Sequence, residues 1–388
     1  MLLFLYYFSL LCVKIDIKTR CGEKYMYDLA IIGGGVSGLT AAAVAINRGL
    51  SVLILEFGAR VGQKLLITGN GKANLSNTNM SAERYNDIFV CDFLHGSQKV
   101  YDFFEYIGLK TKVVDGRVYP YSESAAAVLN LLRKKVEKAE IIVNYEVEDI
   151  SIEEGHFLIN NYYRARNCIF CTGSAATKGK NSHNLLQKMG HRCLELKPSI
   201  VPLITDTTYI KGLSGLRVKA KLSLICNNKV VNSATGEILF KDSGISGIVS
   251  MELSSYIARN SKNYNVSVDF AMDFEEKEIA DFLEKNSLEG LLQRALADAV
   301  VRQALARKVP TYKVVKDFLV EDVKCGSIKN AQVVCGGLDC EQFDKDLQSR
   351  LVCGLYVCGE ALNIDGDCGG YNLHWAFLSG IIAGENIC

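Results

Sequence analysis

Residues 28–39 read Asp28-Leu-Ala-Ile-Ile-Gly-Gly-Gly-Val-Ser-Gly-Leu, and this stretch decides the fold. An apolar strand leads into a glycine turn and then a helix, with the spacing G-x-G-x-x-G. Glycine here permits a tight turn, close approach of the backbone to a pyrophosphate, and packing of helix on strand. The pyrophosphate is then expected at the positive end of the helix. The residues expected to contact it are Gly33, Gly35, Val36, Ser37 and Gly38.

A second apolar strand, residues 51–56, follows the helix expected over residues 37–48 and ends on Glu56. An acid at this distance from the glycine turn accepts hydrogen bonds from ribose hydroxyls. A lone glycine turn is weak evidence, because such turns are common. Strand, turn, helix, strand and acid together predict a dinucleotide-binding domain.

The rest of the chain alternates strands and helices at first, which indicates a parallel sheet. The pattern predicts a helix over 124–139 and strands over 140–145, 146–151, 157–161 and 166–171. Short strands with glycine turns then fill 197–239, and an amphipathic helical region covers 275–307. Strands at 332–335 and 354–358 and a helix over 371–387 return to the first pattern.

The expected fold is therefore α/β: a Rossmann-like domain interrupted by an inserted β-barrel-like plus helical domain. Residues 26–190 and 311–388 form the two parts of the nucleotide-binding domain, and residues 191–310 form the insert. Residues 1–13 are apolar, yet they are too short to span a bilayer and lack the basic start of a signal peptide. Residues 1–25 are expected to be a non-native or flexible extension before Met26, with an amphipathic anchor as the minority interpretation.

The chain has 388 residues with a net charge of +1, which is typical of a globular cytoplasmic protein and argues against a nucleic-acid partner. Its 14 cysteines form no Cys/His cluster with zinc spacing, so reduced thiols and no metal are expected. Neither a membrane partner nor a particular oligomeric state is indicated.

The C-terminal region favours FAD over NAD as the dinucleotide. Strand 354–358 ends in Gly359-Glu360, where a carboxylate can accept hydrogen bonds from a ribityl chain. The segment Asp365-Gly-Asp-Cys-Gly-Gly-Tyr-Asn then opens a helix, whose positive end would stabilise the negative charge of a reduced flavin near N1. The alternative is a simple helix cap at Gly369-Gly370.

Four blocks of sequence give the chain a family resemblance. They are residues 33–38 with Glu56; Gly62-Gln-Lys-Leu-Leu-Ile-Thr-Gly-Asn-Gly-Lys-Ala-Asn-Leu-Ser-Asn; Leu239-Phe-Lys-Asp-Ser-Gly-Ile-Ser-Gly; and Gly359-Glu through Gly370-Tyr-Asn-Leu. The chain resembles the aminoacetone-oxidase-like or BaiN/YhiN-like NAD(P)/FAD-dependent oxidoreductases. The resemblance covers nearly all of residues 26–388 and implies a flavin domain with an inserted barrel-like and helical part.

The resemblance also implies which residues line the cofactor. Val147 would contact the adenine through its backbone, and the strand ending at Thr172-Gly173 would press against the cofactor. A Gly-Asn-Gly turn offers backbone donors and two lysines counter phosphate charge, although a solvated basic loop is the alternative. The residues implied in the second block are Lys64, Thr68, Gly69, Asn70, Gly71, Lys72 and Asn74; those in the fourth are Gly359, Glu360, Gly369, Gly370, Tyr371, Asn372 and Leu373.

The sequence departs from the family pattern at three places. Ala73 stands where the family often has a cysteine, residues 179–184 replace a turn richer in glycine and aspartate, and the helical insert looks short. The first change removes any thiol role at that position. The other two bear on the substrate more than on FAD.

The leading hypothesis is an FAD-dependent oxidoreductase that exchanges a hydride between flavin N5 and a small-molecule substrate. Only one G-x-G-x-x-G is clear, so a dedicated NAD(P)H domain is not indicated, and NAD(P)H is a candidate for a transient electron donor only. Two alternatives stay open: an FAD-containing RNA-modifying enzyme and a non-catalytic flavin-binding protein. No motif identifies the catalytic acid or base. Tyr371 and His374 are candidates by position, and segment 242–247, a glycine-flanked helix start in the insert, would face the active site.

Overall fold

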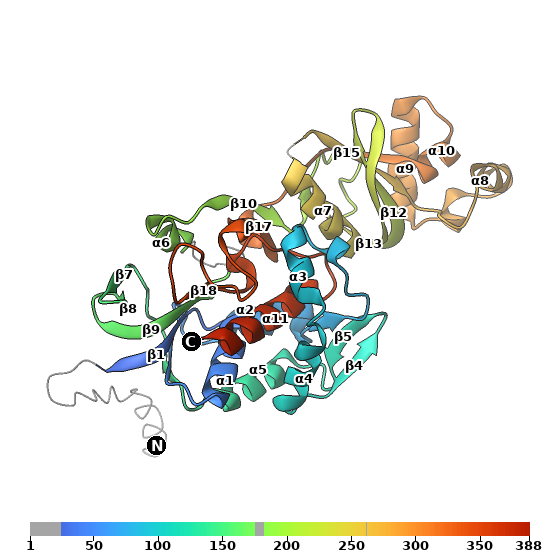
Figure 1. The fold of residues 1–388 in the computed structure, drawn as a ribbon. Helices are drawn as coiled ribbons and strands as arrows, with labels where there is room; N and C mark the ends of the chain where they lie inside the picture. The colour runs from blue at the N-terminus through green and yellow to red at the C-terminus, as the bar shows by residue number, and fades with distance from the viewer. Residues whose placement is uncertain (1–24, 175–181, 261) are drawn as a thin grey trace, which may run out of the picture.

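The computed structural model describes residues 25–174, 182–260 and 262–388, shown in Figure 1. The extension expected over residues 1–25 therefore lies outside the described residues apart from Tyr25, as do residues 179–181 of the departing turn. Two hydrophobic cores form. One takes buried side chains from residues 27–186 and 338–387, and the other from residues 203–323.

The first core is built on a parallel sheet. Within the described residues seven strands join, and β9 pairs with three of them: β1 along its length, β8 at its start and β18 at its end. Apolar runs form these strands because both faces of the sheet are covered. The parallel strands are β6 (Glu140–Ile142), β2 (Val52–Leu55), β1 (Met26–Ile32), β9 (Tyr163–Phe170) and β18 (Leu355–Val357); the antiparallel pair is β7 (Ile150–Glu153) and β8 (His156–Ile159).

Helices α1 (Val36–Asn47) and α11 (Tyr371–Asn386) pack closely against each other on this sheet (Figure 1). A Cβ on Gly380 would lie 2.5 Å from the Ser37 carbonyl oxygen, and one on Gly384 would lie 2.9 Å from that of Ala41. The later contact lies closer to the C-terminus of both helices, so α1 and α11 run parallel. At 1.5 Å per residue, α11 begins roughly 13 Å before Gly380, so its N-terminus extends well beyond that of α1.

Smaller elements surround this pair. An antiparallel sheet of short strands lies near the start of α11, and several helices cover the core. Their bounds are β3 (Ser76–Asn77), β4 (Thr111–Val114), β5 (Arg117–Pro120), α2 (Gln63–Ile67), α3 (Cys91–Leu94), α4 (Gln98–Tyr106), α5 (Ala125–Lys135) and α6 (His183–Lys188).

The second core fills a closed barrel with strand order β11-β14-β13-β12-β15-β16. Along β12 the buried residues alternate with exposed ones, as a barrel wall requires. The strands are β11 (Leu203–Ile204), β12 (Arg217–Cys226), β13 (Lys229–Lys241), β14 (Gly244–Ser246), β15 (Tyr264–Asp269) and β16 (Phe318–Cys325); the helices are α7 (Ile248–Asn260), α8 (Glu276–Leu283), α9 (Arg294–Arg307) and α10 (Thr311–Lys316).

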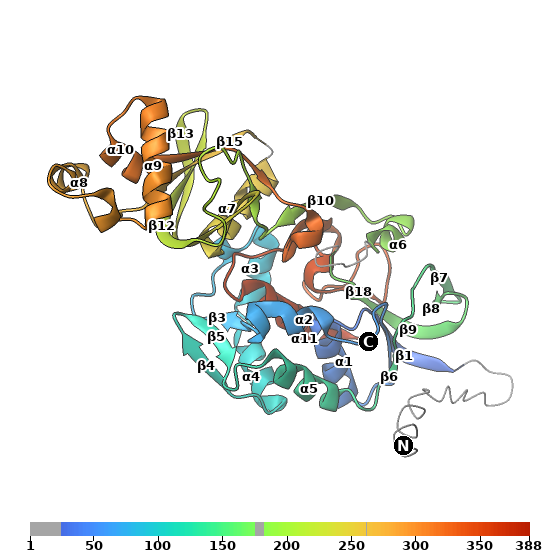
Figure 2. The same ribbon diagram turned by 180° about the vertical axis from the view of Figure 1, so that it is seen from behind.

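Figures 1 and 2 show the barrel projecting from the sheet domain, with α8, α9 and α10 at its far end. Helix α7 and the antiparallel pair β10 (Cys193–Ser199) and β17 (Val333–Leu338) lie between the two cores. The expected α/β fold with an inserted barrel-like and helical part is confirmed. The core of the insert continues past residue 310, because β16 is needed to close the barrel.

The strand expected over residues 146–151 begins only at Ile150. The side chain of Asn160 accepts the backbone N–H groups of Glu148 and Asp149 and donates to the carbonyl of Glu146. These bonds occupy the backbone groups that a strand would pair. Val147 therefore lies in an irregular segment.

Across the described ranges, no helix combines the length and the apolar character that crossing a membrane requires.

Candidate active site

The glycine turn between β1 and α1 is shaped by contacts that admit no side chain at two of its positions. Gly33 has φ 106°, and a Cβ there would lie 2.5 Å from the carbonyl oxygen of Cys171 on the neighbouring strand end. A Cβ on Gly38 would lie 2.1 Å from the carbonyl oxygen of Gly33. Gly35 is different, because a Cβ there would meet no atom within 4 Å. Gly35 thus faces open space at the N-terminus of α1.

Glu56 lies at the end of β2 and organises this turn. Its carboxylate accepts the N–H of Gly34 at 2.7 Å and that of Gly58 at 2.6 Å. The backbone of Tyr145 donates to the carbonyl of Glu56 at 2.9 Å, which places the segment leading to Val147 beside it. The predicted ribose acid and the predicted adenine contact are therefore neighbours in the fold.

Lys64 and Glu360, from the second and fourth blocks, meet in an ion pair of 2.5 Å. The Glu360 carboxylate also accepts the Ser174 hydroxyl at 2.9 Å, just after the predicted Thr172-Gly173 contact. Gly359 has φ 64°, and a Cβ there would lie 2.9 Å from the Ser37 hydroxyl oxygen. Segments far apart in sequence thus converge at the N-terminus of α1.

The Gly-Asn-Gly loop of the second block has left-handed backbone conformations. Gly69, Asn70 and Gly71 all have positive φ, which glycine and asparagine adopt most readily. The Thr68 hydroxyl donates to the carbonyl of Leu65 at 2.7 Å. The ammonium of Lys72 pairs at 2.6 Å with the carboxylate of Glu123, and both side chains are exposed.

Two buried oxygens in this region have no hydrogen-bond partner among the described residues: Oδ1 of Asn74 and Oγ1 of Thr172. A polar atom buried without a partner is costly and rare in folded proteins. Thr172 lies beside Gly33, and Asn74 lies beside Gly370. Both oxygens are therefore positioned to receive hydrogen bonds from a bound molecule.

Helix α11 begins at Gly370, which has φ 105° and no side chain to cap the helix. A Cβ on Gly370 would lie 2.3 Å from the carbonyl oxygen of Ser76, so glycine is required here. The Asn372 side chain binds the loop before the helix: its amide oxygen accepts the N–H of Gly366 and its NH₂ group donates to the carbonyl of the same residue. Leu373 packs against the first core.

The N-termini of α1 and α11 together fit a dinucleotide. Neither helix has a side-chain cap or an acidic residue in its first turn, so both present free N–H groups and positive dipole ends. They point the same way with one beyond the other, so two separated positive helix ends would be available to a bound dinucleotide.

A cavity of about 320 Å³ opens beside the N-terminus of α11. Both cores contribute to its wall, since Glu252 and Leu253 of α7 face the loop before α11. The other lining residues are Asn77, Arg84, Asp115, Arg117, Asn232, Ser233, Ala234, Asp367, Cys368 and Tyr371. Residues 242–247 of the third block are not among the lining residues, and Gly244–Ser246 form strand β14 rather than a helix start; the helix that follows, α7, lines the cavity instead.

The two predicted acid–base candidates are placed very differently. Tyr371 lines the cavity, its hydroxyl donates to the carbonyl of Asn79 at 3.2 Å, and burial raises its pKa. His374 lies in the core, with Nδ1 2.9 Å from the Ser76 hydroxyl and Nε2 3.2 Å from the Ser97 hydroxyl. Burial lowers the pKa of His374 to about 4, so it is neutral at physiological pH. Only Tyr371 lies where a substrate can reach it.

Sequence reasoning missed the charged groups of the cavity. Arg117 follows the tight turn Asp115-Gly116, and Glu252 lies inside a helix of the insert. Neither stands in a motif, so no local signal marks them. Cys368 could have been noticed, because it lies within the quoted Asp365–Asn372 segment.

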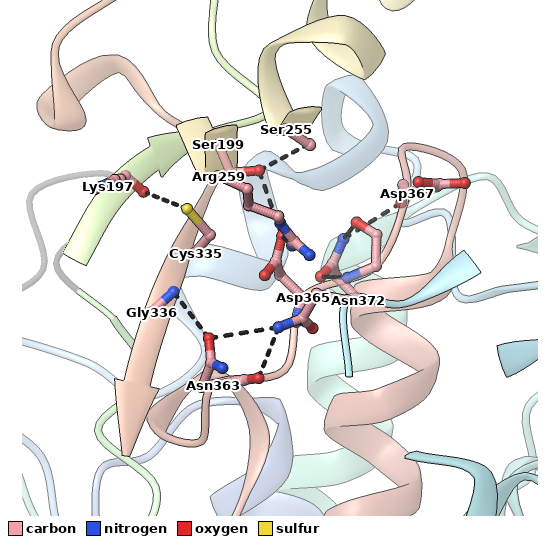
Figure 3. Close-up of polar contacts among 12 residues, drawn as sticks. Lys197, Ser199, Ser255, Arg259, Cys335, Gly336, Asn363, Asp365, Asp367 and Asn372 are labelled. Atoms are coloured by element: carbon pink, nitrogen blue, oxygen red, sulfur yellow. Dashed lines mark hydrogen bonds and ion pairs between the residues drawn. The ribbon is translucent and has the colours of Figure 1, made fainter. Parts of the chain in front are cut away.

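A buried ion pair joins the insert to the loop before α11 (Figure 3). Arg259 of α7 pairs with Asp365, whose side chain is 1% exposed. The Ser199 hydroxyl donates to the same carboxylate at 3.4 Å and lies 2.8 Å from the hydroxyl of Ser255. Burial raises the pKa of Asp365 to about 6 despite the nearby guanidinium. This contact holds α7, and hence Glu252, against the C-terminal block.

The fold and this arrangement define an FAD-dependent oxidoreductase of the Rossmann type. The family model described as "HI0933-like protein Rossmann domain" matches residues 27–386, and the chain belongs to this family. The resemblance drawn from the four sequence blocks is thereby confirmed.

Several individual proteins are similar over nine-tenths or more of both chains. The 3-dehydro-bile acid delta(4,6)-reductase of Clostridium scindens is 31% identical, over 93% of this chain and 98% of that protein. The ribosomal RNA dihydrouridine synthase of Haemophilus influenzae is 24% identical, over 90% and 95%. The structure of 3-ketosteroid-delta4-(5alpha)-dehydrogenase from Rhodococcus jostii RHA1 superimposes with a TM-score of 0.52 at 15% identity, covering 95% of this chain and 98% of that one.

Proposed function

We propose that the chain is a reductase that saturates a carbon–carbon double bond conjugated to a carbonyl group, with NADH or NADPH as the electron donor. The observation that carries this proposal is the cavity at the N-terminus of α11, which combines Tyr371, an arginine and a carboxyl group. FAD, when bound, supplies hydride exchange at N5. The protein has to hold the double bond, polarise the carbonyl and manage one proton.

The residues proposed to hold FAD are those that converge on the two helix N-termini. Gly33, Gly35, Val36, Ser37 and Gly38 take the pyrophosphate, and Glu56 with the Val147 backbone takes the adenosine end. Asn74 and Thr172 offer their unpartnered oxygens. Gly359, Glu360, Gly369 and Gly370 lie toward the ribityl chain and flavin, where the positive end of α11 favours negative charge.

The names of the relatives support the reaction type. A delta(4,6)-reductase of a 3-dehydro acid and a dihydrouridine synthase both saturate a double bond conjugated to a carbonyl. The two substrates differ greatly in size and polarity. The shared chemistry, rather than either substrate, is what we propose for this chain.

The first experiment uses the full chain loaded with FAD under anaerobic conditions. NADH or NADPH is expected to bleach the oxidised flavin absorbance, which then returns on adding a conjugated carbonyl compound. The panel is 4-androstene-3,17-dione, 2-cyclohexen-1-one and uridine, with cyclohexanone as the saturated control. Recovery with uridine alone would favour a nucleic-acid substrate. A flavin that neither nicotinamide reduces, and that no compound of the panel reoxidises after chemical reduction, would contradict the proposal.

The two lysines of the second block are expected to differ in their effect on FAD. Lys64→Met leaves the Glu360 carboxylate without its cation beside the proposed cofactor site. We expect FAD to bind roughly tenfold more weakly, because a factor of ten corresponds to the loss of about one charge-assisted hydrogen bond. Lys72→Met is the matched control, because Lys72 pairs with Glu123 at the surface. Fluorescence titration of the apoproteins with FAD measures both. Equal losses would show that the Lys64–Glu360 pair has no special role.

A further inference from the structure

The cavity brings together charged groups from both cores. Glu252 comes from α7 of the insert, Arg117 from β5, and Arg84 from the 3-10 turn Ala82–Arg84. Asp367 lies in the loop before α11. The titratable and charged groups that line the cavity together with Glu252 are Arg84, Asp115, Arg117, Asp367, Cys368 and Tyr371.

These groups differ in whether they are already paired. The guanidinium of Arg84 forms an ion pair with the carboxylate of Asp367 at 3.3 Å. The carboxyl of Glu252 and the guanidinium of Arg117 form no hydrogen bond or ion pair with any side chain in the described parts of the chain, nor with each other. An acid and a cation that line one cavity and remain unpaired are both available to a ligand.

The surroundings of Glu252 also favour its protonated form. Burial is the largest effect and raises its pKa, and the charge of Asp367 adds to this. Arg117 and Arg84 act in the opposite direction, but burial prevails. A carboxyl group that carries its proton closer to neutral pH is suited to proton transfer.

We propose that Glu252 is the catalytic residue that exchanges a proton with the substrate carbon next to the carbonyl, and that Arg117 binds the carbonyl oxygen. This proposal rests on the function proposed above. It makes the insert part of the active site, because α7 delivers the proton to a substrate held against the flavin side.

FAD, when bound and reduced, would supply the two-electron hydride that the β-carbon takes up, and Arg117 would hold the carbonyl oxygen that receives the π electrons. The enolate so formed takes a proton at the α-carbon: the O–H bond of Glu252 breaks and a C–H bond forms. The double bond is thereby reduced by two electrons and two hydrogens, and the Glu252 carboxylate regains a proton from water.

The proton transfer can be tested without any redox turnover. In reverse, Glu252 as carboxylate removes an α-proton from a saturated ketone, so the FAD-loaded, oxidised protein in D₂O should exchange the α-protons of cyclohexanone. Proton NMR follows the exchange against a protein-free sample. We expect Glu252→Gln to lose roughly 100-fold of the protein-dependent rate, the usual contribution of a positioned acid–base group.

The pH profile and two further variants sharpen the test. The wild-type exchange rate should rise with pH through the raised pKa of Glu252 and be flat in Glu252→Gln; Glu252→Asp should keep part of the rate. Glu289→Gln, an exposed acid of the insert, is the matched control and should exchange like the wild type. FAD content and flavin absorbance of each variant show that it is folded.

The outcomes separate this proposal from the proposed function. No protein-dependent exchange by the wild type, or equal exchange by wild type and Glu252→Gln, would overturn the role of Glu252 even where enones reoxidise the flavin. Exchange that depends on Glu252 would support it even where no compound of the panel accepts electrons. Only the second finding, that no compound of the panel accepts electrons, would count against the reductase.

Discussion

Valine in place of Gly35 is expected to give a folded protein that binds FAD much more weakly. Gly35 has φ −74° and ψ −171°, a backbone conformation open to any residue, and a Cβ would meet no atom of the protein within 4 Å. The added side chain would instead occupy the space where the pyrophosphate is proposed to lie. We expect FAD affinity to fall roughly 100-fold. This corresponds to about 3 kcal/mol of binding free energy, which is the size of a typical overpacking penalty. Flavin absorbance after purification and titration of the apoprotein measure this.

Gly38→Ala is the informative contrast within the same motif. Its Cβ would lie 2.1 Å from the carbonyl oxygen of Gly33, so the change should destabilise the apoprotein itself. Urea unfolding of both apoproteins should therefore show wild-type stability for Gly35→Val and a clear loss for Gly38→Ala. If Gly35→Val binds FAD like the wild type, the cofactor does not lie across this turn.

The glycine motif could be predicted from sequence because most of its contacts lie within one strand–turn–helix unit. Gly38 excludes a side chain through its contact with the Gly33 carbonyl, and Glu56 is held by the same turn, whereas Gly33 excludes one through the Cys171 carbonyl at the end of the neighbouring strand. Such constraints leave a fixed spacing in the sequence. The α/β fold follows from the same unit, because a strand, a crossover helix and a parallel strand leave few topologies.

The cavity could not be predicted in the same way. Arg117 and Glu252 come from different cores and meet only because the insert packs α7 against the loop before α11. That packing depends on tertiary contacts, among them Arg259 with Asp365, that no local spacing records. The ion pair of Lys72 with Glu123 is a further tertiary contact that no local spacing records.

Arg259→Met is expected to cost the most stability of any single change at the junction of the two cores. Asp365 is buried, and one of its carboxylate oxygens has no partner among the described residues. Figure 3 shows the guanidinium of Arg259 reaching the carboxylate from α7. Removing it leaves a buried charge without a counterion, which costs about 3 kcal/mol. The single tryptophan, Trp375 in α11, donates to the carbonyl of Gly359 and reports urea unfolding of this region.

The pH dependence of that loss follows from Asp365. Its pKa of about 6 in the folded chain lies above the unfolded value of 3.8, so its contribution to stability is present below pH 3.8 and is lost as pH rises through 6. Without Arg259 the folded pKa rises further, so the variant should be much weaker than the wild type at pH 8 and closer to it at pH 5. Adding Asp365→Asn should restore most of the loss at pH 8, because no charge then remains buried. Arg294→Met, at an 82% exposed side chain, is the control, and an equal loss there would mean that the buried pair does not hold the insert in place.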